Sequence, residues 1–222
     1  MKILVIADIH GDFQTLEKIL DKSPGPDLVV CPGNFIDAFK LPPEFSQLDI
    51  ADLILQKLLS LGKPLLCVPG NHDPPETLDL FEDYKINLHA KLKPFKGLQF
   101  LGYGGAHTPF NTLFEPTEEE VKEALNSLSN SVKNPLVLVV HNPPKNTKSD
   151  QLSSGKHVGS QAIRDFILAK KPILTLTAHI HEAAGQDILG GTVIFNPGPA
   201  FQGKFGLVEI GKTIKCKTLK LQ

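Results

Sequence analysis

The sequence of 222 residues carries almost no net charge, because 23 basic and 24 acidic side chains leave a formal charge of -1. A protein that coats nucleic acid or an anionic membrane needs a basic excess, so the composition argues against both functions. No apolar stretch is long enough to cross a bilayer, and the N-terminal "MKILVIAD" is too short for the hydrophobic part of a signal peptide. We therefore expect no membrane association and disfavour a nucleic-acid partner, while a local basic groove is left open.

Cysteine is also scarce. The three cysteines, Cys31, Cys67 and Cys216, are odd in number and far apart, with no CxxC pair. They form no disulfide framework, so a reducing cytoplasm is the simplest setting. The chain also lacks internal repeats, low-complexity tracts and a clear linker. We predict a single domain over residues 1–222.

Apolar runs and helical patterns alternate in the first part of the chain. The runs at 2–7, 27–31 and 64–68 predict strands that are buried on both faces. Helices are expected between them, at 11–22 and 46–61. A strand–helix–strand order places successive strands parallel with right-handed crossovers, so the pattern predicts an α/β fold.

The second half is less regular. Strands are predicted at 98–105, 135–140 and 172–177, helices at 117–128 and 161–170, and short β segments with glycine turns from Gly191 onward. Thr117 is followed three residues later by Glu120, which is the spacing of a capping box, and Ser160 is the expected N-cap of the later helix. The C-terminal pattern indicates a second sheet or antiparallel edges on the first. We expect two packed sheets with helices outside.

Polar side chains follow five of the predicted strands, at the point where each strand ends. They are Asp8 and His10, Asn34, Asn71 to Asp73, His141, and His179 with His181. The carboxyl ends of strands in parallel α/β sheets line the crevice where ligands bind. These strand ends can therefore deliver carboxylate, amide and imidazole groups to one place, which is typical of a metal site.

Each of these motifs also has a structural interpretation. "DIH" by itself is more often a capping aspartate with a surface histidine, and many "HxH" pairs hold no metal. "GNHD" could form an asparagine-centred turn whose aspartate caps the next helix. The order and placement of the motifs favour metal binding, because every one falls at the end of an apolar strand.

Taken in order, "DIH" at 8–10, "GN" at 33–34, "GNHD" at 70–73, His141 and "AHIH" at 178–181 resemble the pattern of the calcineurin-like metallophosphoesterase superfamily. More narrowly, "GGAHTPFNTLFEPTEEE", "KHVGSQAIRDFI" and "HIHEAAG" are similar to the small prokaryotic Icc-related phosphoesterases. The resemblance spans residues 3 to about 200. It implies a four-layer α-β-β-α sandwich of two mixed sheets flanked by helices. It also implies an enzyme that hydrolyses phosphomonoesters or phosphodiesters.

The resemblance further implies a binuclear metal centre. One cation would be held by Asp8, His10 and His181, the other by Asn71, His141 and His179, with position 34 bridging the two. A metal-activated hydroxide attacks phosphorus in this family. His72 would assist the leaving group or stabilise transition-state charge, with Asp73 fixing its orientation. Manganese is the expected cation, and iron, zinc, nickel and magnesium are alternatives.

Position 34 departs from the family pattern, because asparagine stands where the family has aspartate. A carboxylate bridges two cations well, whereas an amide offers one neutral oxygen and a nitrogen that donates. Asp8 is then the sole negative ligand, so we expect its site to fill first and the second site to fill weakly, or only with bound phosphate. Asp37 would reach the metals only through a bend in the loop. Asp37 is better interpreted as a helix-capping residue or as a residue that contacts the metal ligands without binding a metal itself.

Two further histidines are weaker candidates for substrate binding. His107 follows a glycine-rich strand end, and His157 precedes an expected helix start, a place suited to an anion. Exposed loop positions are the favoured alternative for both. His89 is expected at the surface.

Three functions are compatible with these motifs. The leading one is a metal-dependent hydrolase of a small phosphoester. The second is a degenerate relative with one metal or none that serves as a binding or scaffold module. Asn34 favours the second, whereas the retained "GNHD" and "HIH" favour the first. A nuclease is the weakest, because the additional DNA-binding domains of such enzymes do not fit in 222 residues. A homo-oligomer is left open.

Overall fold

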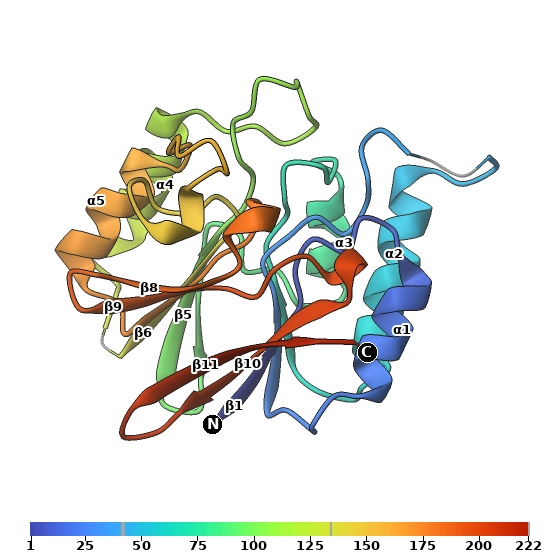
Figure 1. The fold of residues 1–222 in the computed structure, drawn as a ribbon, viewed down its shortest axis with the longest axis horizontal. Coiled ribbons are helices and arrows are strands. Elements are labelled where there is room, and N and C mark those ends of the chain that lie inside the picture. Colours follow the sequence, from blue (N-terminus) through green and yellow to red (C-terminus); the bar gives the residue numbers. More distant parts are fainter. Residues whose placement is uncertain (41–42, 134, 222) are drawn as a thin grey trace.

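The computed structural model describes residues 1–40, 43–133 and 135–221. Two mixed β-sheets lie face to face, and helices cover the outer side of each (Figure 1). This is the predicted α-β-β-α arrangement, so the expected fold class is confirmed. No helix in the described parts of the chain is both long enough and apolar enough to span a membrane.

The first sheet has the strand order β11-β10-β1-β2-β3. Its strands are β1 (Lys2–Val5), β2 (Leu28–Cys31), β3 (Leu65–Cys67), β10 (Lys204–Ile210) and β11 (Ile214–Lys220). Strands β1, β2 and β3 are parallel, as the strand–helix alternation predicts. Strand β10 runs antiparallel to β1, and β11 runs antiparallel to β10. The C-terminal hairpin is therefore an antiparallel edge of the first sheet, which was one of the two predicted alternatives.

The second sheet has the order β4-β5-β6-β7-β9-β8. Its strands are β4 (Lys91–Phe95), β5 (Leu98–Tyr103), β6 (Leu136–Val140), β7 (Leu174–Leu176), β8 (Gly185–Leu189) and β9 (Thr192–Asn196). Strands β5, β6, β7 and β9 are parallel, whereas β4 and β8 pair antiparallel at the two edges. Strands β4 and β8 were not predicted from the sequence. Edge strands such as these tolerate polar residues and proline, and β4 contains Pro94.

The helices form two outer layers (Figure 1). Helices α1 (Phe13–Asp21), α2 (Gln47–Leu59) and α3 (Thr77–Asp83) cover the first sheet, and α4 (Glu118–Ser129) and α5 (Gln161–Lys170) cover the second. Thr117 and Glu120 form the predicted capping box of α4, and the Ser160 side chain accepts the Ile163 N–H at the start of α5. Both predicted caps are confirmed.

Neighbouring side chains along a central strand enter different cores. In β1, Leu4 packs in the cluster that contains helices α1 to α3, whereas Ile3 and Val5 belong to the cluster between the sheets. In β6, Val139 lies between the sheets and Leu138 packs in the cluster that contains α4 and α5. Because both faces of these strands are buried, apolar residues occupy successive positions, which explains the unbroken apolar runs.

The carboxyl ends of the parallel strands meet where the two sheets approach each other. His141 at the end of β6 contacts the carbonyl oxygen of Pro32 after β2, with 2.7 Å between Nδ1 and O. The backbone N–H of His179, after β7, donates to the Asp8 carboxylate after β1. These contacts join loops of the two sheets and place the polar strand ends side by side.

Candidate metal centre

The candidate ligands converge on one place between the two sheets. They lie after β1 (Asp8 and His10), after β2 (Asn34), after β3 (Asn71), at the end of β6 (His141) and after β7 (His179 and His181). Asp8 Oδ1 lies 4.0 Å from His10 Nε2 and 3.7 Å from His181 Nε2. The rings of His141 and His179 are 5.1 Å apart between centroids. The structure therefore brings together all seven residues that the resemblance implied as ligands.

Left-handed backbone turns direct these side chains toward one another. Four of the ligands have positive φ angles: 53° for Asp8, 50° for His10, 59° for Asn34 and 72° for His179. Non-glycine residues rarely adopt this conformation, and such strain is found preferentially at functional sites. Backbone hydrogen bonds hold it here, because His10 N–H and Ile9 N–H both donate to the carbonyl oxygen of Asn34.

Two glycines let the loops after β2 and β3 pass very close to each other. A Cβ atom on Gly70 would lie 2.1 Å from Asn34 Oδ1, and one on Gly33 would lie 2.5 Å from Gly70 N. Any side chain at either position would separate the loops. This close approach accounts for the glycine of both "GN" motifs.

Asp8, His10 and His181 form the first candidate cation site, with one ligand atom from each within 4.8 Å of the others. Burial alone would raise the pKa of Asp8, but contacts with His181, His141 and His10 keep it well below its ordinary value. Burial lowers the pKa of His10 to about 4. At neutral pH the carboxylate is therefore ionised and His10 is neutral, which are the states that metal ligands require. Burial lowers the pKa of His181, but the Asp8 carboxylate raises it above its ordinary value, so His181 must give up a proton to bind a cation.

Two further candidate ligands, His141 and Asn71, direct lone pairs toward each other. The Pro32 carbonyl oxygen can only accept, so the His141 Nδ1 beside it carries the proton. Burial lowers the pKa of His141 to about 4, which leaves Nε2 unprotonated at neutral pH. Asn71 Oδ1 lies 2.9 Å from that Nε2. Two hydrogen-bond acceptors at this separation, with no proton between them, are suited to bind a cation through their lone pairs.

Asn34 places an amide NH2 group among these ligands. Its Nδ2 lies 3.0 Å from Asp8 Oδ1, 3.4 Å from Asn71 Oδ1 and 3.5 Å from His10 Nε2. Its Oδ1 points away and accepts the backbone N–H of His72 at 2.9 Å. A donor nitrogen thus occupies the space where a bridging oxygen would be needed. Turning the amide around would present the oxygen but would break the bond to His72.

Asp73 joins two loops and does not orient His72. Its carboxylate accepts four backbone N–H groups, from Asn34 at 2.9 Å, Phe35 at 2.8 Å, Ile36 at 3.1 Å and Gly70 at 2.7 Å. The side chain is fully buried. The prediction that Asp73 fixes the orientation of His72 is wrong, because both carboxylate oxygens are directed at the backbone of the β2 and β3 loops.

Asp37 and Ala38 make the polar contacts to the His72 ring, and the rings of His10 and Phe39 pack edge-on against it. His72 Nδ1 accepts the Ala38 N–H at 3.1 Å, and Asp37 Oδ1 lies 3.7 Å from the same nitrogen. Nδ1 has one lone pair, which Ala38 uses, so a neutral ring carries its proton on Nε2. Burial lowers the pKa of His72 and favours this neutral form. The loop bends so that Asp37 lies beside His72 and lines both pockets next to the candidate ligands.

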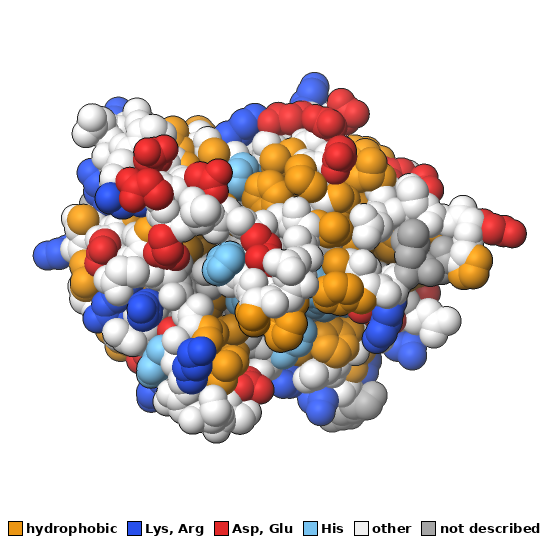
Figure 2. All heavy atoms as spheres, turned by 90° about the horizontal axis from the view of Figure 1, so that it is seen from above, with side chains coloured by type: hydrophobic (Ala, Val, Ile, Leu, Met, Phe, Trp, Pro, Cys, Tyr) orange, Lys and Arg blue, Asp and Glu red, His pale blue; other side chains and the backbone are white. Residues whose placement is uncertain are grey.

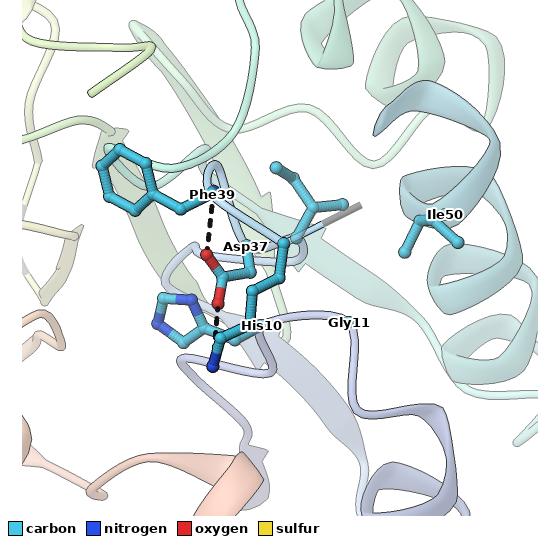
Figure 3. Close-up of a pocket in the computed structure, with 7 residues that line it drawn as sticks. His10, Gly11, Asp37, Phe39 and Ile50 are labelled. Carbon is cyan, nitrogen blue, oxygen red and sulfur yellow. Dashed lines mark hydrogen bonds and ion pairs between the residues drawn. The ribbon is translucent and has the colours of Figure 1, made fainter. Parts of the chain in front are cut away.

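Asp37, His72 and His10 make up a second group with ligand atoms within 4.8 Å of one another. Figure 3 shows the Asp37 carboxylate beside His10. Its Oδ1 also accepts the Phe39 N–H at 3.0 Å. The Ala38 N–H uses the one lone pair of His72 Nδ1 and the proton sits on Nε2, so the neutral His72 ring offers no free lone pair to a cation. We therefore assign no cation to it.

An open pocket of about 510 Å³ lies beside the Asp8 group. Its lining includes His10, His72 and His181 together with Phe39, Lys40 and Phe201. An adjoining pocket of about 480 Å³ shares His10 and Phe39 with it (Figure 3). Figure 2, which looks down on the upper side of the molecule in Figure 1, shows histidine side chains recessed among apolar ones. The candidate metal centre is therefore accessible to a small molecule.

An aromatic contact from Phe201, not predicted from the sequence, completes the surroundings of the histidines. Its ring lies 5.4 Å from that of His10 and 5.1 Å from that of His181 between centroids. Phe201 follows the turn "NPGPA", and its backbone N–H donates to the carbonyl oxygen of Asp8. The only sequence signal was the proline–glycine turn directly after β9.

The other histidines lie apart from this centre. His107 is exposed and lies 3.5 Å from Glu115, and His157 Nδ1 contacts Asp150 Oδ1 at 2.7 Å. Neither lines the two pockets beside the Asp8 group. The expectation of a surface position for His89 is wrong. Its Nδ1 accepts the backbone N–H of Gly104, and burial lowers the pKa of His89 to about 4.

The model of the calcineurin-like phosphoesterase family matches residues 1–183, the part of the chain that contains every candidate ligand. The chain belongs to this family, which confirms the resemblance. Family and fold together point to a hydrolase of the phosphoesterase type, a class that typically binds divalent metals.

Three relatives give this assignment its context. An uncharacterized protein of Methanocaldococcus jannaschii, MJ1162, is 34% identical over 206 residues, which cover 90% of this chain and 88% of that protein. The structure of TT1561 of Thermus thermophilus is similar with a TM-score of 0.77 at 22% identity, covering 99% of this chain and 98% of that one. A dimetal phosphatase from Danio rerio has a TM-score of 0.69 at 12% identity, with 98% and 95% covered. The two structures share the fold.

Proposed function

We propose that the protein hydrolyses a small phosphoester with one firmly held divalent cation, which we take to be manganese, and a second, weakly held one. The observation that carries this proposal is the pair of lone pairs on His141 Nε2 and Asn71 Oδ1, which face each other at 2.9 Å without a proton between them. A buried acceptor needs a donor or a positive group beside it. The Asn34 NH2 lies 3.4 Å from Asn71 Oδ1, and a cation would serve the lone pairs of both Asn71 Oδ1 and His141 Nε2.

Asp8, His10 and His181 would hold the first cation, a two-histidine, one-carboxylate set that suits first-row metals. Asn71, His141 and His179 would hold the second. Bound divalent cations in such enzymes neutralise phosphoryl oxygens and lower the pKa of water. The first set carries one negative charge and the second carries none, so the first is expected to bind more tightly.

His72 would act on the substrate as a hydrogen-bond donor. It lines the pocket beside the Asp8 group, and the bond from Ala38 leaves the proton of the neutral ring on Nε2. A neutral imidazole donates a hydrogen bond without readily giving up its proton. Of the two roles that the resemblance implies for His72, stabilisation of transition-state charge therefore fits better than protonation of the leaving group.

The His72→Ala variant is expected to lower the hydrolysis of p-nitrophenyl phosphate and of its bis-ester, with added Mn²⁺, by about 10²- to 10³-fold, the usual effect of losing one charge-stabilising donor. Bound manganese should not change, because His72 belongs to neither proposed ligand set. His157→Ala serves as the matched control and should retain full activity, because His157 lines neither pocket beside the Asp8 group. Activity that survives the loss of His72 would mean that another site, or a contaminant, is responsible.

The Asn34→Asp variant is expected to bind the second cation on the order of 10²-fold more tightly and to hydrolyse these esters faster. A unit charge at ~4 Å is worth about 4 kcal/mol at an effective dielectric constant of 20, and the cost of burying the carboxylate offsets part of this. Isothermal titration with Mn²⁺ of both chains measures the change. Two tightly held cations in the unmodified protein would contradict the assignment of a weak second site.

A binding or scaffold module is the second candidate function. The Asn34 amide favours it, because its Nδ2 lies within 3.5 Å of three candidate ligand atoms. Absence of hydrolysis in both the unmodified and the Asn34→Asp chains, when both are folded and loaded with Mn²⁺, would favour this candidate over the enzyme.

A further inference from the structure

The loop between β5 and α4 holds Asn71, although the two are far apart in the sequence. Asn71 Nδ2 donates to Thr112 Oγ1 at 3.0 Å. The backbone carbonyl of Asn71 accepts the N–H groups of Leu113 at 2.9 Å and Phe114 at 3.0 Å. This loop belongs to the "GGAHTPFNTLFEPTEEE" stretch, which supplies none of the proposed ligands. Its contacts nevertheless fix both the backbone and the side chain of one of them.

Glu115 lies behind Thr112 in the same loop. Its carboxylate accepts both the backbone N–H and the hydroxyl of Thr112, and also the N–H of Thr108 at 3.2 Å and its hydroxyl at 2.6 Å. The side chain is 13% exposed. Burial alone would raise the pKa of Glu115, but the hydrogen bonds from Thr108 and Thr112 lower it to about 2. The carboxylate is thus an acceptor with no proton to donate.

The charge on Glu115 determines which group donates in the hydrogen bonds that join Glu115, Thr112 and Asn71. An ionised carboxylate only accepts, so the single hydroxyl hydrogen of Thr112 is donated to Glu115. The oxygen of Thr112 then has only lone pairs left for Asn71, and these pair with an NH2 group but not with a carbonyl oxygen. The amide of Asn71 is thereby held with Nδ2 toward Thr112 and with Oδ1 toward His141 Nε2.

We propose that Glu115 and Thr112 are positioning residues that fix the orientation of the Asn71 amide and thereby set the affinity for the second cation. The proposal rests on the proposed metal centre. The positioning role can be tested separately from the metal centre. In the described structure none of these hydrogen bonds is made by the first set of ligands, Asp8, His10 and His181.

A metal-free measurement tests the orientation directly. In the NMR spectrum of the protein without metal, the side-chain NH2 protons of Asn71 should exchange slowly with water, because one is bonded to Thr112. Thr112→Val keeps the shape of the side chain but removes the hydroxyl, so this protection should be lost. Thr112→Ser restores the hydroxyl and should restore the protection. Thr213→Val, at an exposed threonine, is the matched control and should change nothing.

A titration with Mn²⁺ tests the consequence for the cation, with Asn34→Asp as the background so that both sites can be followed. Thr112→Val should weaken the second cation by about 10- to 100-fold, the usual effect of losing a group that orients a ligand. The first cation should be unaffected, and Thr112→Ser should restore the second. Glu115→Gln should also weaken it, because an amide at position 115 can donate to Thr112 and let the Asn71 amide turn around.

The outcomes separate this proposal from the proposed function. If the NH2 protection and the second-cation affinity are the same in Thr112→Val as in its parent, the positioning role is refuted even though the metal centre stands. If no chain binds manganese while the protection is lost as expected, the hydrogen-bond relay exists and the proposed function fails. Loss of both cations together in Thr112→Val would indicate a general disruption of the fold and would also refute the specific role.

Discussion

The Asp8→Asn variant is expected to lose tight Mn²⁺ binding and to hydrolyse p-nitrophenyl phosphate about 10³-fold more slowly than the unmodified protein. Asp8 is the only carboxylate in the two proposed ligand sets, so its replacement leaves neutral ligands alone. A unit charge at ~4 Å is worth about 4 kcal/mol at an effective dielectric constant of 20, and each 1.36 kcal/mol corresponds to about a tenfold change. Metal analysis after dialysis measures the loss of binding, and initial rates at an Mn²⁺ concentration that just saturates the unmodified protein measure the loss of activity.

The Asp21→Asn variant is a suitable control for this experiment, because Asp21 is exposed at the end of α1 and lines neither pocket beside the Asp8 group. It changes the net charge by the same amount and should leave metal content and rate unchanged. Asp8 also accepts hydrogen bonds from Asn34 Nδ2 and from the His179 N–H. A circular dichroism melt is therefore needed to establish that Asp8→Asn remains folded. A folded Asp8→Asn chain that retains one tightly bound manganese would place the cation elsewhere.

The largest loss of stability is expected for Asp73→Asn. The four backbone N–H groups that donate to Asp73 come from two loops, which its carboxylate joins. Asparagine keeps one accepting oxygen but turns an NH2 group toward two of these donors, leaving two buried N–H groups without an acceptor. Each unsatisfied buried donor costs about 1–3 kcal/mol, so the free energy of unfolding should fall by about 2–6 kcal/mol.

Urea denaturation of the metal-free protein measures this loss without a contribution from bound cations. Asp165→Asn, at an exposed position on α5, is the matched control and should change the free energy of unfolding by less than about 0.5 kcal/mol. Because Asp73 also holds the backbone of Asn34 and Gly70, the variant should lose metal affinity even under conditions where it is folded. An Asp73→Asn chain as stable as the unmodified protein would show that these four hydrogen bonds do not hold the loops together.

Much of the fold follows from short-range features of the sequence. The apolar runs that became β1, β2 and β6 are buried on both faces, and short unbroken runs of this kind are typical of the central strands of a parallel sheet. Thr117 with Glu120 is a local signal as well, because a capping box depends on residues three positions apart. The convergence of the ligands was predictable because all of them follow parallel strands.

The features that the sequence did not predict depend on contacts between distant segments. Asp73 next to His72 in the sequence suggested a pair, but its partners lie mainly in the loop after β2. His89 lies in a segment where apolar and polar residues alternate, and the fold places it against Tyr103 and Gly104. The polar β4 and β8 are strands only because neighbouring strands pair with them. In each case contacts between distant segments determine where the residue or strand lies, and no local sequence pattern predicts such contacts.

The most direct test of the metal centre is the anomalous X-ray signal of crystals of the unmodified protein soaked in Mn²⁺. We predict a strong peak bonded to Asp8, His10 and His181, with a weaker peak or none beside Asn71, His141 and His179. A sole strong peak beside His141, or manganese bound at neither set in protein that hydrolyses phosphoesters, would contradict the account.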